Sequence, residues 1–424
     1  MVKGVLSEPL TGVSEKATKV ISDASSMIGS MIGSMIPEEL RDQMGFIIAV
    51  TTLIIIIIVG ALYINYTLSG KISRKCKFFD GVYSQNIKIK SIAGKDGIIS
   101  IPDFRNLPIV NFYVKTSYNS CSIGGYINDN VSLCILTKII GQGVRCFDFE
   151  IFNLKNEAII ATSTNDDPYM KETYSYVRFY DALNTLVEGA MISGCNNIYD
   201  PLFISLRMKT KNVNVYNDIA SHLKKYTNQY LLTEKYNCEN MSDFGKNVTI
   251  NEIISKIVII VQDLDNSNVL QSSNLYYYTN IYVNKNSSFK FETFTNLVND
   301  NEDSTIKYTK LKLSYVTPDV YNGSPSNPEP ASCFARGVQF IGMSYQIFDT
   351  YLQAYEYYFD KLGTAFVLKN QELMYTVHHQ YTPAIDMQAP KTGVLIDLGN
   401  GKFANYGNTK EEGGESIGVG GVKP

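Results

Sequence analysis

Residues 143–150 read GVRCFDFE, an apolar run that carries two carboxylates two positions apart. Side chains of a strand alternate between its faces, so Asp148 and Glu150 would point the same way from one buried strand. Further apolar runs resemble buried strands, at 109–114, 158–161, 202–206 and 257–261. Segments between them have a 3.6-residue period, at 132–141, 179–191 and 215–226. The alternation predicts an α/β fold, and periodicity alone goes no further.

Five motifs refine this prediction because they occur in a fixed order. They are FYVKTSYN, GVRCFDFE, FISLR, GVQFIGMSYQ and GTAFVLK, at 112–119, 143–150, 203–207, 337–346 and 363–369. In this order they resemble the eukaryotic-type phosphoinositide-specific phospholipases C. The resemblance implies a TIM-type (β/α) barrel of the phospholipase C-like phosphodiesterase kind, split into X-like and Y-like half-barrels.

The resemblance and the composition together divide the chain into seven segments. We expect an amphipathic or flexible leader (1–45), a transmembrane helix (46–66), a basic juxtamembrane connector (67–104), the X-like half (105–262), an Asn-, Ser- and Asp-rich linker (263–305), the Y-like half (306–388) and a Gly-rich tail (389–424).

The catalytic positions implied by the family are substituted. The family uses two histidines for proton transfer and phosphate contact, and these positions correspond here to Tyr118 and Ala161. A phenol with a pKa of about 10 is a poor base near neutral pH, and alanine has no proton to exchange. The resemblance therefore predicts that no catalytic residue is intact.

The implied calcium site is altered in a different way. Asn119, Asp148 and Glu150 keep oxygen ligands, with Asp and Glu exchanged relative to the family, but a further acidic position is Arg207. Calcium requires six to eight oxygens, and a guanidinium repels it. We expect neither metal nor other cofactor at this vestigial site. We predict instead an ion pair of Arg207 with Asp148 or Glu150, with Tyr118 stacked nearby.

Other candidate ligands are weaker. Ser326 lies at a turn that the resemblance implies for inositol contact, although a Ser-Asn pair in a Pro-rich loop also serves as a turn cap. The strand at 257–262 has no basic residue for inositol phosphates. Of the three histidines, His222 falls near the end of a helical segment, and His378 and His379 follow the last predicted strand. None of these placements predicts a catalytic base.

A stretch of 19 uncharged residues, 46–64, is long enough to cross a bilayer as one helix, although a buried core helix is the alternative. Basic residues lie mainly after it, at Lys71, Arg74, Lys75 and Lys77. The positive-inside rule then predicts a single-pass protein with its barrel on the cytosolic side. Before the span, Met27, Met31 and Met35 share a helical stripe that either packs at the membrane or belongs to a poorly ordered leader.

The cysteine pattern and the net charge limit the redox compartment and the class of partner that the sequence predicts. Seven scattered cysteines without a C-x-x-C pair indicate reduced thiols rather than a disulfide framework. Five N-x-S/T triplets, beginning at Asn65, Asn130, Asn240, Asn247 and Asn286, are expected by chance in an Asn-rich chain. A net charge of −3 argues against a nucleic-acid partner.

Two functions remain open at this stage. The favoured hypothesis is a pseudoenzyme: a membrane-anchored barrel that serves as a structural or interaction module. The alternative is an active phosphoric diester hydrolase that acts on phosphoinositide or a related lipid. AT-rich residue usage and the anchor suggest a large DNA virus, which gives the hypothesis of a minor capsid protein between an internal virion membrane and a capsid shell. The expected partners are then the membrane and other structural proteins.

Overall fold

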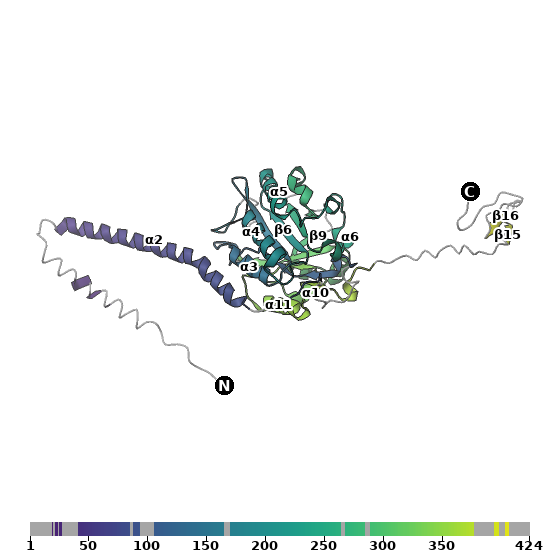
Figure 1. The fold of residues 1–424 in the computed structure, drawn as a ribbon. Helices are drawn as coiled ribbons and strands as arrows, with labels where there is room; N and C mark the ends of the chain where they lie inside the picture. Colours follow the sequence, from purple (N-terminus) through teal and green to yellow (C-terminus); the bar gives the residue numbers. More distant parts are fainter. Residues whose placement is uncertain are drawn as a thin grey trace, which may run out of the picture. The chain divides into compact units, whose positions relative to one another are not determined.

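The computed structural model describes residues 19, 22–23, 25–27, 41–84, 88–93, 106–164, 170–263, 268–284, 289–376, 394–397 and 403–406. The chain divides into two compact units, Met1–Met374 and Tyr375–Pro424, which are considered separately. The first unit contains a long helix and an α/β barrel (Figure 1).

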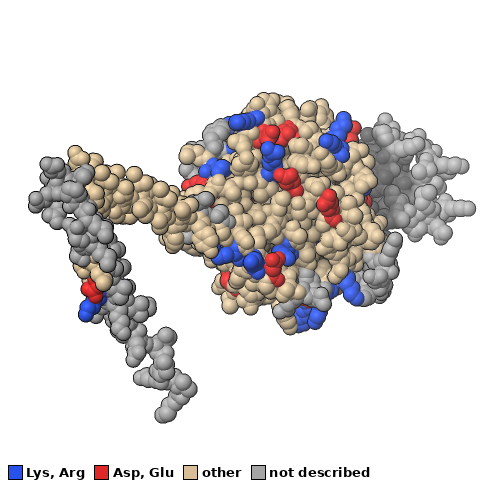
Figure 2. All heavy atoms as spheres, turned by 60° about the vertical axis from the view of Figure 1, so that its left-hand side comes forward, with Lys and Arg blue, Asp and Glu red and all other residues tan. Residues whose placement is uncertain are grey.

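Helix α2 (Arg41–Val82) contains the predicted membrane span. Its segment Gln43–Ile64 is long and apolar enough to cross a bilayer, and none of it is buried within the protein. Thr51 donates its hydroxyl to the carbonyl of Ile47, so this polar group needs no water. Figure 2 shows the exposed part of this helix free of Lys, Arg, Asp and Glu side chains. The helix continues to Val82, so the first part of the predicted connector is helical.

The first sheet is built around β3 (Cys146–Leu154), the strand with the two carboxylates. Its strand order is β5-β4-β3-β6-β7-β8, and β2 also pairs with β3. The pairs β2/β3, β3/β6, β6/β7 and β7/β8 are parallel, whereas β4 runs antiparallel to β3 and β5. The other strands are β2 (Thr116–Ser117), β4 (Glu157–Ala161), β5 (Val177–Arg178), β6 (Leu202–Met208), β7 (Ile257–Asp263) and β8 (Ile281–Val283).

The second sheet has the order β14-β1-β13-β10-β9. Its strands are β1 (Phe112–Val114), β9 (Phe289–Thr293), β10 (Leu313–Thr317), β13 (Phe340–Ile341) and β14 (Phe366–Leu368). β1 and β2 are separated only by Lys115, so one extended segment takes part in both sheets, and β8 and β9 are in contact at the other junction. The two sheets together form the barrel, with aromatic side chains such as Phe203 and Phe340 packed inside it at 5.4 Å between ring centroids.

Helices surround the sheets because their apolar stripes need a partner surface. The helices predicted at 132–141, 179–191 and 215–226 appear as α3 (Leu133–Gly141), as α4 (Phe179–Leu186) extended by a π-helix (Val187–Ser193), and as α5 (Val213–Thr227). The second half adds α8 (Phe294–Asn299), α9 (Glu302–Leu311), α10 (Pro330–Ala335) and α11 (Thr350–Leu362). Gly363 ends α11 with φ of 71°, a conformation that glycine adopts without strain.

The segment interpreted as a linker, 263–305, contains secondary structure of its own. It includes β8, which pairs with β7, and β9, which pairs with β10. These strands are only three and five residues long and lie among Asn, Ser and Asp, so the composition of the window conceals them. The linker's strands thus complete both sheets.

The cysteine prediction is wrong for two of the seven. Cys76 of α2 and Cys134 of α3 form a disulfide, whereas Cys121, Cys146, Cys195, Cys238 and Cys333 are free. The two paired residues are 58 positions apart and meet because α2 packs on α3, a tertiary contact that spacing does not reveal.

Parts of the leader and tail predictions fall outside the described residues. Met27 is helical and exposed, but Met31 and Met35 are not described, so the methionine stripe stays a prediction. In the second unit, β15 (Val394–Asp397) and β16 (Phe403–Tyr406) pair as an antiparallel hairpin within the predicted Gly-rich tail.

Candidate functional site

The predicted site residues meet at the carboxyl ends of two neighbouring parallel strands. In the register of β3 and β6, Asp148 lies opposite Ser205 and Glu150 lies opposite Arg207. Residues opposite each other in a sheet project from the same face, so all four side chains share one face. Asn119 joins them from the turn after β2, where its φ of 45° is tolerated by asparagine.

Arg207 forms the ion pair that the sequence predicts, and it does so with both carboxylates. Its Nε lies 3.0 and 3.1 Å from the two carboxylate oxygens of Asp148, and Nη2 lies 2.8 Å from Oδ1 of the same residue. Nη1 donates to Oε1 of Glu150 at 2.6 Å, and Nη2 also donates to Oδ1 of Asn119 at 2.6 Å. Side-chain exposure is 10% for Arg207, 0% for Asp148 and 3% for Glu150, so the pair is buried.

Neutral donors complete the coordination of the carboxylates. The Ser205 hydroxyl donates to Asp148 Oδ2 at 2.9 Å, and the backbone N–H of Ser163 donates to Glu150 Oε2 at 2.8 Å. Burial of a carboxylate costs free energy unless the group is paired with a cation and hydrogen-bonded. Asp148 and Glu150 each meet both conditions. We refer to Asn119, Asp148, Glu150 and Arg207 as the arginine cluster.

Tyr118 lies against the arginine cluster as predicted. The guanidinium carbon of Arg207 is 4.2 Å from the centroid of its ring, within cation–π distance. Burial raises the pKa of Tyr118 well above its usual value of 10, although Arg207 acts in the opposite direction. The phenol therefore stays protonated near neutral pH and does not act as a base.

Arg207 retains its charge in this setting. Burial alone would lower its pKa, but the carboxylates of Asp148 and Glu150 raise the pKa well above its usual value. The cluster thus holds a permanent cation.

A calcium ion does not fit these residues. The oxygens of Asn119 and Asp148 that would bind it already accept hydrogen bonds from Arg207, and the guanidinium would lie next to the metal. Among the described residues, no group of three or more His, Cys, Asp and Glu side chains has the geometry of a metal site.

The remaining candidates lie elsewhere or lack reactive groups. Ala161 is buried on β4 opposite Glu150, where its methyl group cannot transfer a proton. Ser326 is exposed on β12 (Ser324–Ser326), while its neighbour Asn327 fixes the loop through bonds to the backbone of Ser344 and Ile347. His222 pairs with Asp218 on α5 at 3.3 Å, whereas His378 and His379 lie outside the described residues.

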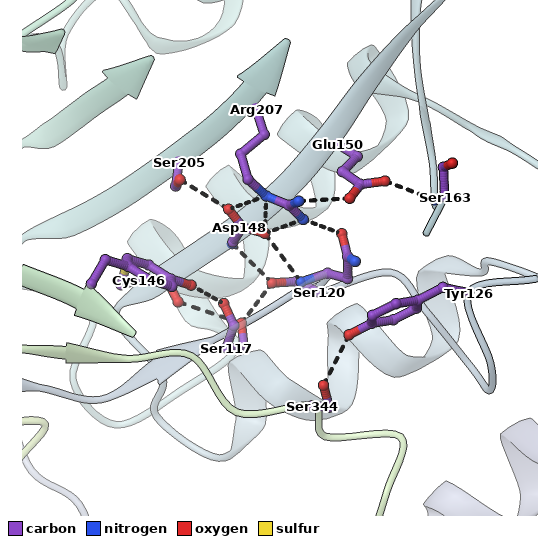
Figure 3. Close-up of polar contacts among 12 residues, drawn as sticks. Ser117, Ser120, Tyr126, Cys146, Asp148, Glu150, Ser163, Ser205, Arg207 and Ser344 are labelled. Atoms are coloured by element: carbon purple, nitrogen blue, oxygen red, sulfur yellow. Dashed lines mark hydrogen bonds and ion pairs between the residues drawn. The ribbon is translucent and has the colours of Figure 1, made fainter. Parts of the chain in front are cut away.

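The neutral residues of the site were not predicted from the sequence. Ser205 is two positions before Arg207 on the same strand, so strand alternation could have identified it. Tyr126 and Ser344, which share a 2.9 Å hydrogen bond beside the site, come from loops far apart in sequence and gave no local signal (Figure 3).

Comparison with known families agrees with this architecture. Residues 105–263 match the X domain of phosphatidylinositol-specific phospholipase C, and residues 254–372 match its Y domain. The structure is similar to the crystal structure of S. officinalis PLC21, with a TM-score of 0.52 and 17% identity, and to that of L. pealei PLC21, with a TM-score of 0.53 and 17% identity. Each comparison covers 63% of this chain and 38% of the other. No curated protein matches the chain.

The chain belongs to the phosphatidylinositol-specific phospholipase C family, and its fold is the TIM-type barrel of that family. Because it matches well under half the length of the solved relatives, the comparison establishes the barrel and not the activity of those larger proteins.

Proposed function

We propose that this protein is a membrane-anchored phospholipase C-like barrel without phosphodiesterase activity, which serves as a structural or interaction module. The observation that carries the proposal is Arg207, whose guanidinium takes the hydrogen-bonding oxygens of Asn119, Asp148 and Glu150. An internal cation thus stands where the family resemblance implies calcium.

The chemistry of diester cleavage supports the same conclusion. Attack of a sugar hydroxyl on phosphorus requires a base, a general acid for the leaving group and a cation near the developing charge. Tyr118 is held protonated by burial and Ala161 has no ionisable group. Arg207 supplies positive charge, but its donors already bind the protein's own oxygens.

The test is turnover by the full chain on phosphatidylinositol vesicles with calcium, in parallel with an active family member. We expect no release of inositol phosphate above a boiled control. Reproducible turnover that Glu150→Gln abolishes would refute the proposal and establish the alternative, an active hydrolase.

We extend the proposal to localisation and partners. The span in α2 supports anchoring, and the basic residues after it favour a cytosolic barrel. The proposed partners are the membrane and other structural proteins, such as those of a capsid shell if the source is a virus. Mass spectrometry of purified particles tests the capsid role, and absence of the chain from particles would refute it.

A further inference from the structure

A group of basic residues follows the membrane span of α2 within two turns of helix. This basic cluster consists of Lys71, Arg74, Lys75 and Lys77, and no Asp or Glu occurs in α2 from Gln43 to Phe79. Residues three and four positions apart are neighbours on a helix, and three pairs of the cluster have this spacing. Like charges at these spacings destabilise a helix. An anion bound among them would remove this repulsion.

The most exposed residues of the basic cluster face away from the barrel. Cys76, which is bonded to Cys134 of α3, and Phe79, which is 1% exposed, mark the side of α2 that packs on the barrel. Arg74 and Lys77 are each two positions before one of these residues, and two positions on a helix are about 160° apart. Both side chains are exposed. They are therefore accessible to a ligand outside the barrel.

The other two residues of the cluster lie at the border between α2 and the barrel. Lys71 and Lys75 are half-buried, and Lys71 Nζ lies 3.0 Å from Oδ1 of Asp129. The Lys71 side chain is 35% exposed, so solvent screens this ion pair. Because an ammonium group has three donors, Lys71 can bind Asp129 and an external anion together.

The span holds the cluster close to the headgroups of the bilayer. Side chains of a helix point toward its N-terminus, which for α2 is the direction of the membrane. Arg74 shows this clearly, because its Nη1 lies 2.6 Å from the position that a Cβ on Gly70 would occupy. The guanidinium thus lies one turn nearer the span than its own backbone, in space that the glycine leaves open.

The depth of this guanidinium follows from the helix rise. Gly70 is six positions after Ile64, the last residue of the span, which corresponds to about 9 Å of helix. Headgroups extend roughly 5 to 7 Å beyond the hydrocarbon on each side of a bilayer. The Debye length is about 8 Å at physiological ionic strength, so the charge of Arg74 acts on the headgroup phosphates with little screening.

We infer that the basic cluster of α2 binds the headgroups of anionic phospholipids, such as phosphatidylserine, in the leaflet where the span ends. A lipid rather than a soluble phosphate is the ligand, because the span keeps a layer of headgroups beside the cluster at all times. This inference rests on the anchoring part of the proposed function and is independent of whether the barrel is catalytic. It adds that the anchor selects the lipids around it.

The test is the lipid preference of the full chain in phosphatidylcholine vesicles that contain a trace of spin-labelled lipid. The EPR spectrum separates lipid held at the protein surface from bulk lipid. One basic residue near the surface favours an acidic lipid by about fivefold. Lipids that contact no cation dilute this effect, so we expect spin-labelled phosphatidylserine to be enriched about twofold or more over spin-labelled phosphatidylcholine. The enrichment should disappear in molar salt, where the Debye length is about 3 Å.

Removal of charge provides a matched pair of variants. Arg74→Gln combined with Lys77→Gln should lower the enrichment of phosphatidylserine toward that of phosphatidylcholine. The control combines Lys224→Gln on α5 with Lys361→Gln on α11, which removes the same charge from exposed positions outside α2. This control should keep the enrichment of the wild type. The salt dependence of the wild type tests the inference without any substitution.

The outcomes that contradict the inference are distinct from those that contradict the anchor. Equal amounts of both lipids at the protein surface, enrichment that survives molar salt, or an equal loss in the control variant refutes lipid binding by the cluster while the anchor remains. Loss of the enrichment on addition of inorganic phosphate at constant ionic strength refutes the choice of a lipid ligand. Loss of the full chain from vesicles after an alkaline carbonate wash refutes the anchor and with it the proposed membrane function.

Discussion

Arg207 stands where the family resemblance implies a carboxylate. A site that would bind an external cation therefore contains a cation of its own, the guanidinium group. A buried ion pair is weak evidence for stability, since desolvation offsets much of the attraction between the charges. Its partners nevertheless depend on one another, because removal of either one leaves a buried charge uncompensated.

Removal of the guanidinium is therefore expected to destabilise the barrel. Arg207→Met leaves Asp148 and Glu150 buried without a cation, and we expect a loss of about 3 to 5 kcal/mol of unfolding free energy. Arg178→Met is the control, because Arg178 is 61% exposed and 3.9 Å from Glu157, a pair worth roughly 0 to 1 kcal/mol. The measurement is the unfolding transition of the full chain in nanodiscs. Equal effects of the two substitutions would contradict the role of the arginine cluster.

Restoration of a carboxylate is expected to restore a response to calcium. Arg207→Glu places a third acidic side chain beside Asp148 and Glu150, next to Asn119. The three carboxylates repel one another unless a cation binds between them. We expect millimolar calcium to raise the thermal midpoint of this variant and to leave that of the wild type unchanged. A calcium-induced rise in the wild type would show that Arg207 does not exclude the metal.

The buried Lys369 is expected to make the stability of the folded protein depend on pH. It is 3% exposed, its Nζ donates to the carbonyl of Thr309 at 3.1 Å, and burial lowers its pKa well below the usual 10.5. A lysine whose pKa is lowered in the folded state binds fewer protons there than in the unfolded state. The folded state is therefore most stable above pH 10.5, where the lysine is neutral in both states. This stability is lost as the pH falls through the folded pKa. Lys369→Met should raise the thermal midpoint more at pH 7 than at pH 10, whereas the exposed control Lys361→Met should not. An identical gain at both pH values would contradict the assignment.

At the scale of elements, the joint between α2 and α3 is the feature that separates this chain from a barrel on a flexible tether. One disulfide and one ion pair join the two helices, and a second ion pair joins α2 to Asp129 in the loop before α3, all within three turns of α2. The sequence predicted α3 and the membrane span of α2, but it assigned the part of α2 that meets α3 to a connector and did not predict the contact. Helical periodicity identifies an apolar face without identifying its partner. Short strands were lost for a related reason: β8 has only three residues, which is too few to show a period.

The covalent joint has a measurable contribution. A crosslink between residues 58 positions apart is expected to stabilise the fold by about 4 kcal/mol through the entropy of the unfolded chain. Paired replacement, Cys76→Ser with Cys134→Ser, should lower the thermal midpoint, and the free-thiol control Cys238→Ser should not. If reduction of the wild type changes neither its midpoint nor its migration on a gel, the disulfide is absent in solution.

At the scale of the whole molecule, the family motifs predicted more than periodicity did. They predicted the barrel fold, and the strand arrangement that the resemblance implies, together with strand alternation and charge, predicted that Arg207 would pair with Asp148 or Glu150. What the sequence could not supply was the set of long-range partners, such as Tyr126 with Ser344 and Cys76 with Cys134. Those contacts depend on how loops and helices pack after the barrel forms, and no local pattern encodes them.

Two features of the molecule bear on the side of the membrane that the barrel occupies. Lys71, Arg74, Lys75 and Lys77 follow the span and favour the cytosol, whereas a stable disulfide is typical of an oxidising compartment. The basic residues and the disulfide are both accounted for if the barrel is cytosolic during synthesis, where Cys76 and Cys134 are reduced. The two cysteines would then form their disulfide after the protein leaves the reducing environment.

This order of events predicts a specific topology. In microsomes, added protease should digest the barrel, and the exposed triplets at Asn240 and Asn247 should remain unglycosylated because the transferase acts on the luminal side. Maleimide should label Cys76 and Cys134 in cells but not in protein isolated under oxidising conditions. The span Gln43–Ile64 of α2 should remain in the membrane in both cases. A protected barrel that carries glycans at Asn240 or Asn247 would place it in the lumen from the start. In that case the disulfide would have been the better guide to topology than the basic residues.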